Sequence, residues 1–275
     1  MSARRSPQPE GPPPPAVVQR IRLRYAKRGR LRFTSHRDVA RLLERAVRRA
    51  GLPVAHSAGF TPHPKISWLG ASPTGVASEA EYVEIGLTTA LDPADVRARL
   101  DASLPPDLDI LDAVVAGPGA LADRLEASSW RLRLPGVQQA DAEHSVAAFL
   151  AESHVLVSRR TKDGTRELDA RAAVVSLTAT PPESGGADQP CAILHAVVRH
   201  TTPVVRPDDV LAALRAVAAL ELEAPMVATR LAQGPLHGVR EDGAAGPASV
   251  TVSDPLEPDR AAGEPGPAET VTGPA

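Results

Sequence analysis

The chain has 275 residues, a formal net charge of −2 and a single cysteine, Cys191. One cysteine excludes an intrachain disulfide, a cysteine-rich zinc site and an iron–sulfur cluster held by this chain alone. No apolar run approaches the roughly 18 residues of a membrane-spanning helix, and no signal-peptide pattern follows Met1. We therefore expect a cytoplasmic protein without a membrane partner.

Positive charge is concentrated at the start of the chain. Residues 1–65 contain 15 Lys and Arg against 3 Asp and Glu, whereas the remaining residues contain 16 and 30. This segregation predicts a basic face on the first domain, suited to a phosphate-bearing partner. The alternative is that an arginine-rich composition only scatters arginines over solvated surface.

Composition divides the chain into five segments. Neither end can bury enough apolar surface to fold, so we expect disorder at both. The segments are a disordered Pro-rich arm (1–16), a first domain with the basic face (17–116), a linker (117–126), a second domain (127–235) and a disordered acidic Ala/Gly/Pro tail (236–275).

The first predicted strand is Arg20–Tyr25, in which arginines alternate strictly with apolar residues. This period of two predicts a half-buried strand whose exposed face is cationic and carries Arg20, Arg22 and Arg24. The segment Lys27–Arg30 predicts a turn or bulge, after which we expect Leu31 and Phe33 to continue the apolar side.

A helix follows, with Ser35 as its N-cap and Asp38 as the capping-box partner. Apolar residues lie along one side of this helix, and arginines at i, i+4, i+8 and i+11 lie along another. The arginines are Arg37, Arg41, Arg45 and Arg48. Gly51 in the C′ position and Pro53 end the helix.

The remaining elements complete two similar halves. In the first half we expect strands at 65–69, 82–87 and 108–115 and a helix at 92–104. In the second we expect strands at 130–134, 155–159, 173–178, 192–199 and 221–223 and helices at 141–152 and 207–220. The order β-α-β-β-α-β is that of the split-βαβ motif. The predicted fold is α+β, with two tandem ferredoxin-like units.

The loop Ala55–Lys65 concentrates groups that recognise anions. Ser57, His63 and Lys65 would hold a phosphate or carboxylate through a hydroxyl, an imidazole and an ammonium. Phe60 would stack on a base or ring. The alternative is a proline-braced connection in which Phe60 fills a gap in the core.

Other chemistry has weaker support. His36, His56 and His63 lack the ligand spacing of a zinc site, so we expect no metal. The chain has no P-loop, G-x-G-x-x-G or G-x-S-x-G motif. Ser35 and His36 at a helix N-terminus favour an anion contact. Catalysis would fall to His36 or His63 as general acid or base.

The second domain adds a basic hairpin that begins with Arg159 and Arg160. It would extend the basic face of the first domain. It would equally fit a solvated hairpin whose arginines pair with Glu167 and Asp169, because such exposed pairs are common and contribute little.

These segments resemble the radical-SAM-linked domain family of unknown function. The resemblance rests on the run Tyr25–Ser67, on Gly75–Leu87 and on Arg160–Arg171, and it spans roughly residues 20–230. It implies a stand-alone member, encoded beside or fused to an uncharacterised radical-SAM protein. The iron–sulfur cluster and S-adenosylmethionine would belong to that separate partner, since three cluster cysteines are needed, and this chain would hold no cofactor. Family members are encoded near ribosomal-protein and ribonuclease genes, which favours RNA.

We therefore expect a non-catalytic accessory or substrate-presenting subunit for a radical-SAM partner, which binds RNA or a ribosome-related assembly through its basic face. The predicted anion-binding residues are Arg22, Arg24, Lys27, Arg28, Arg30, Arg32, Ser35, His36, Arg37, Arg41, Arg45, Arg48, Ser57, Phe60, His63, Lys65, Arg159 and Arg160. One alternative is a metal-independent RNA-processing or RNA-modifying enzyme that uses His36 and His63. Another is a protein-docking scaffold without nucleic acid.

Overall fold

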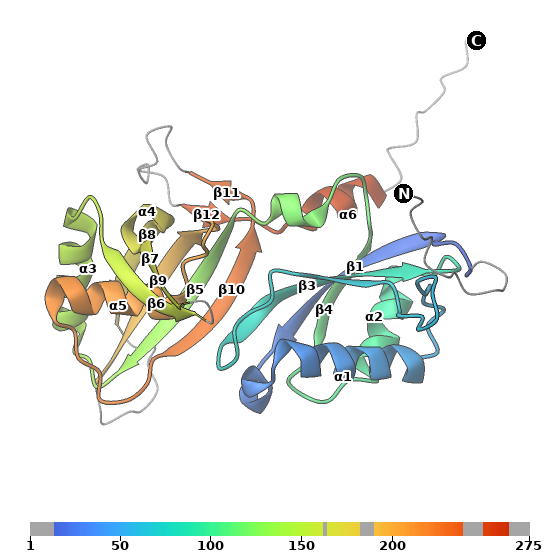
Figure 1. The fold of residues 1–275 in the computed structure, drawn as a ribbon, viewed down its shortest axis with the longest axis horizontal. Coiled ribbons are helices and arrows are strands. Elements are labelled where there is room, and N and C mark those ends of the chain that lie inside the picture. The colour runs from blue at the N-terminus through green and yellow to red at the C-terminus, as the bar shows by residue number, and fades with distance from the viewer. Residues whose placement is uncertain (1–13, 162–163, 182–189, 239–249, 264–275) are drawn as a thin grey trace, which may run out of the picture.

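The computed structural model describes residues 14–161, 164–181, 190–238 and 250–263. One mixed sheet of eight strands runs through both halves of the chain, with helices packed against it (Figure 1). The predicted α+β class is confirmed. Within these residues, no helix is long and apolar enough to cross a membrane.

The first half places its helices on one side of its strands. Its elements are β1 (Gln19–Lys27), η1 (Gly29–Phe33), α1 (His36–Arg49), β2 (Ile66–Leu69), β3 (Ala77–Leu87), α2 (Pro93–Asp101) and β4 (Ile110–Val115). The strand order is β4-β1-β3-β2, and every neighbouring pair is antiparallel. Residues of β1 and β3 such as Ile21, Leu23 and Val83 pack against Leu43 of α1 and Leu100 of α2 to form the core.

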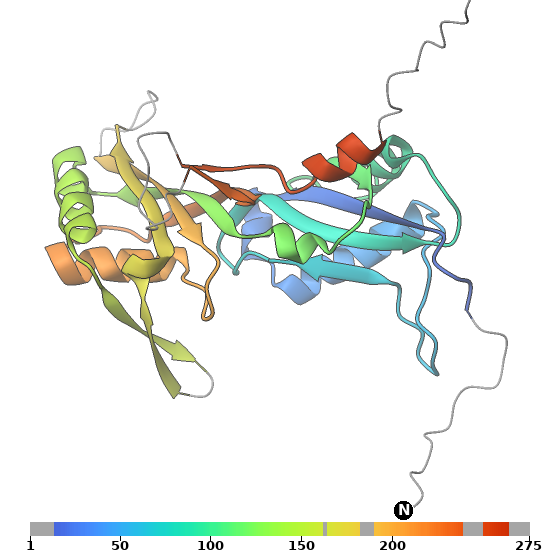
Figure 2. The same ribbon diagram turned by 90° about the horizontal axis from the view of Figure 1, so that it is seen from above.

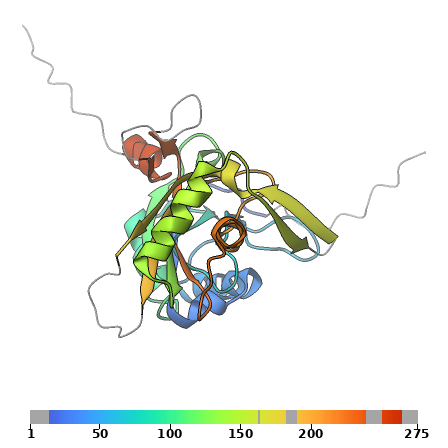
Figure 3. The same ribbon diagram turned by 90° about the vertical axis from the view of Figure 1, so that its left-hand side faces the viewer.

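The second half repeats this order and adds a hairpin. Its elements are β5 (Ala127–Pro135), α3 (Gln139–Ala151), β6 (Leu156–Thr161), β7 (Gly164–Asp169), α4 (Ala170–Ala173), β8 (Val174–Thr180), β9 (Cys191–Arg199), α5 (Pro207–Ala218) and β10 (Val227–Gly234). The strand order is β10-β5-β9-β8. The strands β6 and β7 pair only with each other, and their hairpin projects from the body of the protein (Figures 2 and 3).

Strand β10 joins the two halves. It pairs antiparallel with β5 along its length and parallel with β3 through Thr229↔Ala77 and Arg230↔Ser78. The two sets of strands are therefore one continuous sheet. The division into two tandem ferredoxin-like units is not confirmed, because the halves share this sheet and the β6–β7 hairpin lies outside it.

Several predicted boundaries differ from the structure; for example, β3 begins at Ala77 rather than at residue 82. The strand predicted at 221–223 is β10, which begins at Val227, where a better β-forming segment follows the exposed Glu221 and Glu223. The second helix ends at Asp101 rather than at residue 104. The predicted linker 117–126 contains the 3-10 helix η2 (Leu121–Arg124), whose Leu121 is buried.

The predicted disorder from residue 236 is also wrong in part. The structure places β11 (Leu236–His237), β12 (Thr251–Val252) and α6 (Glu257–Gly263) there, with Leu256 fully buried. This order comes from contacts with residues more than 100 positions earlier, which composition does not reveal. The tail predictions for 239–249 and 264–275, and the arm prediction for 1–13, lie outside the described residues.

Candidate nucleic-acid interface

The arginine face of β1 is open to solvent only in part: Arg20 is 62% exposed, but Arg22 and Arg24 are not. The Arg22 side chain is 3% exposed, and its Nε donates to Glu84 Oε2 at 3.0 Å. Its Nη1 donates to Asp259 at 2.8 Å and its Nη2 to the Gly119 carbonyl at 2.5 Å. These hydrogen bonds raise the pKa of Arg22, although burial, the largest single influence, lowers it. Arg22 is therefore an internal structural cation and not a surface contact.

The other basic residues near the end of β1 are also engaged or covered. Lys27 is buried and donates to the Pro73 carbonyl at 3.3 Å, and burial lowers the pKa of its ammonium. Arg28 binds Glu79 and Asp109, and the hydrogen bond to Glu79 is the main cause that raises the pKa of Arg28. Arg24 is half-buried. These residues do not form the exposed basic surface that the alternation predicted.

Helix α1 carries a row of exposed arginines. We call Arg37, Arg41, Arg45 and Arg48 the α1 arginine stripe, and the structure places all four side chains in solvent. Arg41 lies 3.4 Å from Asp38, and both side chains are more than half exposed, so this pair contributes little. The opposite side of α1 packs into the core through Val39, Leu43, Ala46 and Val47. The stripe therefore faces outward on a rigid helix.

An exposed aromatic ring lies just before α1. Phe33 ends η1 and is 59% exposed, and the guanidinium of Arg32 lies 4.6 Å from the centroid of its ring. Arg30 is exposed on the same short helix. The prediction that Phe33 continues the apolar side of the strand is wrong, because β1 ends at Lys27 and η1 turns the ring outward. A phenylalanine flanked by arginines in a charged segment was the signal that sequence reasoning missed.

Ser35 and His36 have structural partners. Ser35 Oγ accepts from the Asp38 amide at 3.2 Å and donates to Asp38 Oδ2 at 2.7 Å. The predicted N-cap is confirmed, and the hydroxyl is used by it. The His36 ring packs edge to face on Trp68, with 5.2 Å between ring centroids. His36 nonetheless stays exposed, so an anion contact by its ring remains sterically open.

The loop between α1 and β2 forms a narrow protrusion. His56 and Pro64 form an isolated bridge, and Ser57 Oγ accepts from the His63 amide at 3.0 Å. The Ser57 hydroxyl thus binds the main chain of His63 and does not pair with its ring. Phe60 is 73% exposed, which excludes the alternative that it fills the core. His63 and Lys65 are exposed as well.

The loop and the Phe33 region lie at opposite ends of α1 (Figure 1). A helix of this length spans about 20 Å. His36 begins the helix and His63 follows its end, so the two imidazoles are not arranged as a joint acid–base pair. Across the described ranges, no group of three His, Cys, Asp or Glu side chains could hold a metal ion.

The β6–β7 hairpin leaves Arg160 and Arg166 exposed and uses Arg159 in an internal contact. Arg159 donates to the Val204 carbonyl at 3.0 Å and to Asp209 Oδ2 at 2.7 Å, which ties the hairpin to α5. At the base of the hairpin, Asp169 pairs with His154 at 2.7 Å and not with a hairpin arginine. The predicted pairing of this basic segment with Asp169 is therefore replaced by a pairing with Asp209.

The fold and this surface define an α+β protein with an outward-facing arginine helix. A family model described as "Uncharacterized protein conserved in bacteria (DUF2344)" matches residues 20–207. The match covers more than half of the chain, so the chain belongs to this family. The match therefore includes β1 to β9, with α1 and its stripe, and it ends at the start of α5.

The other comparisons add little. A search of curated proteins found no match. Among solved structures, an unknown protein from Galdieria sulphuraria is similar at 12% sequence identity, over 77% of this chain and 98% of that chain, with a TM-score of 0.22. A similarity at this level supports no argument about fold or function.

Proposed function

We propose that the protein binds single-stranded RNA through α1 and η1, as a non-catalytic accessory subunit. The observation that carries the proposal is the exposed Phe33, with Arg32 against its ring, at the start of the outward-facing α1 arginine stripe. Arginines contact backbone phosphates and an exposed ring stacks on a base, which is the combination that single-strand binding uses. RNA is also what the sequence resemblance favours.

The charge balance supports a nucleic-acid backbone as the ligand. Two acidic residues, Asp38 and Glu44, share α1 with the stripe, and the pair of Asp38 with Arg41 is long and solvated. Each neutralised phosphate on a single strand should contribute about −0.7 to the slope of log affinity against log salt. Four stripe arginines give a steep salt dependence. An acidic protein partner would use the charges but leave the Phe33 ring without a base to stack on.

The same proposal includes a radical-SAM protein as the functional partner, on the sequence resemblance alone. That partner would carry the iron–sulfur cluster and S-adenosylmethionine, since this chain has one cysteine. We place the complex in the cytoplasm. We also propose that the two halves derive from ferredoxin-like units, because the orders β4-β1-β3-β2 and β10-β5-β9-β8 both follow the split-βαβ pattern.

The test is a titration of the full chain with a labelled single-stranded oligouridine at several salt concentrations. The variant Arg41→Glu/Arg45→Glu should bind at least about tenfold more weakly and lose about 1.4 from the salt slope. The matched control is Arg133→Glu/Arg215→Glu, which changes two exposed arginines of the second half by the same charge and should bind as the wild type does. Phe33→Ala should lose about 1–3 kcal/mol of binding free energy without a change in salt slope.

Two results would replace the proposal. If the full chain does not bind RNA at low salt, the better-supported alternative is a protein-docking scaffold, in which the stripe binds a partner protein without nucleic acid. If the purified chain cleaves or modifies RNA in the presence of a chelator and loses this activity in His63→Ala, the enzymatic alternative with His36 and His63 holds.

A further inference from the structure

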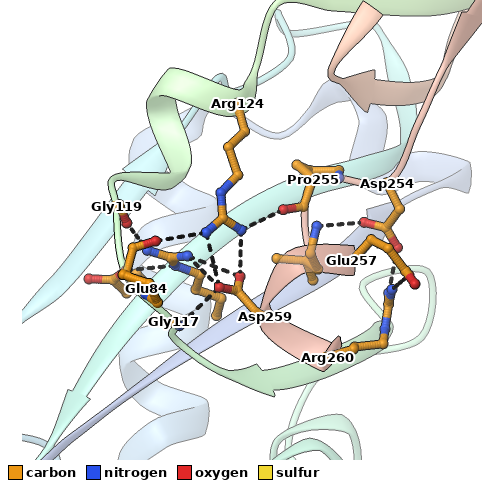
Figure 4. A network of polar contacts seen from close by, with 12 residues as sticks. Glu84, Gly117, Gly119, Arg124, Asp254, Pro255, Glu257, Asp259 and Arg260 are labelled. Atoms are coloured by element: carbon orange, nitrogen blue, oxygen red, sulfur yellow. Dashed lines mark hydrogen bonds and ion pairs between the residues drawn. The ribbon is translucent and has the colours of Figure 1, made fainter. Parts of the chain in front are cut away.

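The segment Asp254–Arg260 lies on the face of the first-half sheet opposite to α1 and α2 (Figure 1), and its polar contacts are drawn in Figure 4. Leu256 is fully buried there against Tyr82 of β3, Val114 of β4 and Leu121 of η2. This leucine inserts into a small apolar pocket that is separate from the main core of the first half. The segment is thus held by one apolar anchor at this point.

A second anchor lies three residues further on. The Asp259 side chain is fully buried, and its Oδ1 accepts from Arg22 Nη1 at 2.8 Å and from the Gly117 amide at 2.9 Å. Its Oδ2 accepts from Arg124 Nη1 at 2.9 Å. Burial is the largest influence and raises the pKa of Asp259, but the hydrogen bonds from Arg124, Arg22 and Gly117 together lower it. The carboxylate therefore lies charged in a site built from two guanidinium groups and a main-chain amide.

The segment fills only part of the space available to it. A cavity of about 390 Å³ continues from the Asp259 site and shares Arg22 and Gly117 with it. Leu69 and Leu121 give the cavity an apolar side, while Arg20, Ser67 and Glu84 give it polar groups, and Glu84 binds both Arg20 and Arg22. A peptide longer or bulkier than the chain's own segment therefore has room to bind beside Arg22.

The residues that form this site and the segment that occupies it differ in whether the family model matches them. The two arginines, the amide and the apolar pocket all lie within residues 20–207, which the family model matches, whereas Asp254–Arg260 lies outside them. We propose that this surface is a binding site for an acidic peptide segment of a partner protein, recognised by a leucine and a carboxylate three residues later, and that Asp254–Arg260 is an intramolecular ligand that competes with it.

The energetics fit a site of this kind. Arginine–carboxylate contacts with several hydrogen bonds are directional and strong for their size, and removing the leucine side chain from water adds a favourable, non-directional contribution. An internal ligand reduces the apparent affinity of a competing one by the fraction of molecules in which the site is free. The partner peptide must therefore bind this site more tightly than the internal segment does. Alternatively, the partner protein must make additional contacts with this chain outside the site.

The experiment uses the full chain with Leu256→Ser and Asp259→Asn, which weakens both anchors of the internal segment. A labelled peptide with the sequence of Val250–Gly263 is titrated by fluorescence anisotropy against this variant and against the wild type. We expect the variant to bind the peptide at least about tenfold more tightly than the wild type, because its own segment competes less. Adding Arg124→Ala to the variant should abolish the binding.

The peptide itself supplies a matched control. The peptide change Asp259→Asn should abolish binding, whereas Glu257→Gln, which removes the same charge from a side chain that is 72% exposed, should leave it unchanged. A peptide with alanine at every position except the equivalents of Leu256 and Asp259 should retain binding within about tenfold, if these two anchors carry recognition.

Two outcomes overturn the inference. Circular dichroism and tryptophan fluorescence first establish that the double variant is folded, and a folded variant that does not bind the peptide shows that the segment is only a structural part of the fold. If the wild type is a dimer in solution that Leu256→Ser/Asp259→Asn converts to a monomer, the occupant is a second copy of the chain. No nucleic acid is present in this assay, so its result is independent of the RNA proposal.

Discussion

A buried cation, Arg230 of β10, lies at the junction of the two halves. It donates to Glu81 of β3, to Ser78 Oγ at 3.3 Å and to Gln233 Oε1 at 3.3 Å, and it lies 5.6 Å from the centroid of the Trp130 ring. Glu81 also accepts from the Ser72 amide at 3.0 Å. Burial, the largest influence, raises the pKa of Glu81, but the charge of Arg230 and the hydrogen bonds lower it. The pair is thus an ionised buried contact between the halves.

Removing one member of this pair should be costly. Arg230→Ala leaves Glu81 buried without its counter-charge, so we expect the free energy of unfolding to fall by about 3–5 kcal/mol. Urea denaturation followed by circular dichroism measures this change. Arg133→Ala, at an exposed position of the neighbouring strand, should change stability by less than about 0.5 kcal/mol. A loss near that of the control would show that solvent reaches Glu81 and that the junction is not closed.

His200 makes stability depend on pH. Its Nδ1 lies 2.7 Å from the Leu125 carbonyl and its Nε2 2.7 Å from Ser128 Oγ. Burial is the main cause that lowers the pKa of His200, and the charge of Arg230 acts in the same direction. The unfolded chain therefore takes up the proton first as the pH falls below about 6.5, and the free energy of unfolding decreases from there downward.

The measurement compares urea denaturation at about pH 7.5 and about pH 5.5, since the stability difference between them reports proton uptake by the unfolded chain. We expect the wild type to lose stability at the lower pH, and His200→Gln to lose less. His144→Gln changes an exposed histidine of α3 and should behave as the wild type does. Equal losses in wild type and His200→Gln would assign the pH dependence to other groups.

At the scale of elements, α1 is the one most fully predicted from the sequence. Its cap, its length and its two sides follow from local spacing, and the structure agrees with each of them. The cap can be tested because Ser35 Oγ accepts the Asp38 amide. Ser35→Ala should lower the free energy of unfolding by about 1 kcal/mol in urea denaturation. Ser158→Ala, on the exposed β6, should change it by less than about 0.5 kcal/mol, and equal effects would mean that the cap contributes nothing.

Strand β1 shows which features could not be predicted from the local sequence. Alternation correctly separated the apolar side from the arginine side. It could not show that Glu84 and Asp259 would bind Arg22, since these partners lie 62 and 237 positions away in the chain. The same limit applies to α6, whose seven residues carry no periodic signal and are ordered by Leu256 and Asp259. The exposure of the α1 arginines was predicted correctly because it depends on local helix geometry, whereas the predicted exposure of Arg22 was wrong because it depends on distant partners.

The whole molecule should unfold as one unit, because β10 is hydrogen-bonded to both β3 and β5. The chain offers one tryptophan reporter in each half, Trp68 against the first core and Trp130 in the second. The variants Trp68→Phe and Trp130→Phe each keep one tryptophan. In each variant we expect tryptophan fluorescence and circular dichroism to give the same urea midpoint. Midpoints that differ between fluorescence and circular dichroism would show that one half unfolds without the other.

The position of β10 also has a consequence for synthesis. A ribosome makes residues 227–234 after every other strand of the eight-stranded sheet, yet this strand lies at the centre of that sheet. Until it emerges, β5 presents an unpaired edge and so does the start of β3 at Ala77 and Ser78, whereas β2 already covers β3 further along; such open edges associate with other chains. Folding of the sheet must therefore finish late in translation or after release. A nascent chain stalled before Val227 would be a natural client for chaperones that shield open strand edges.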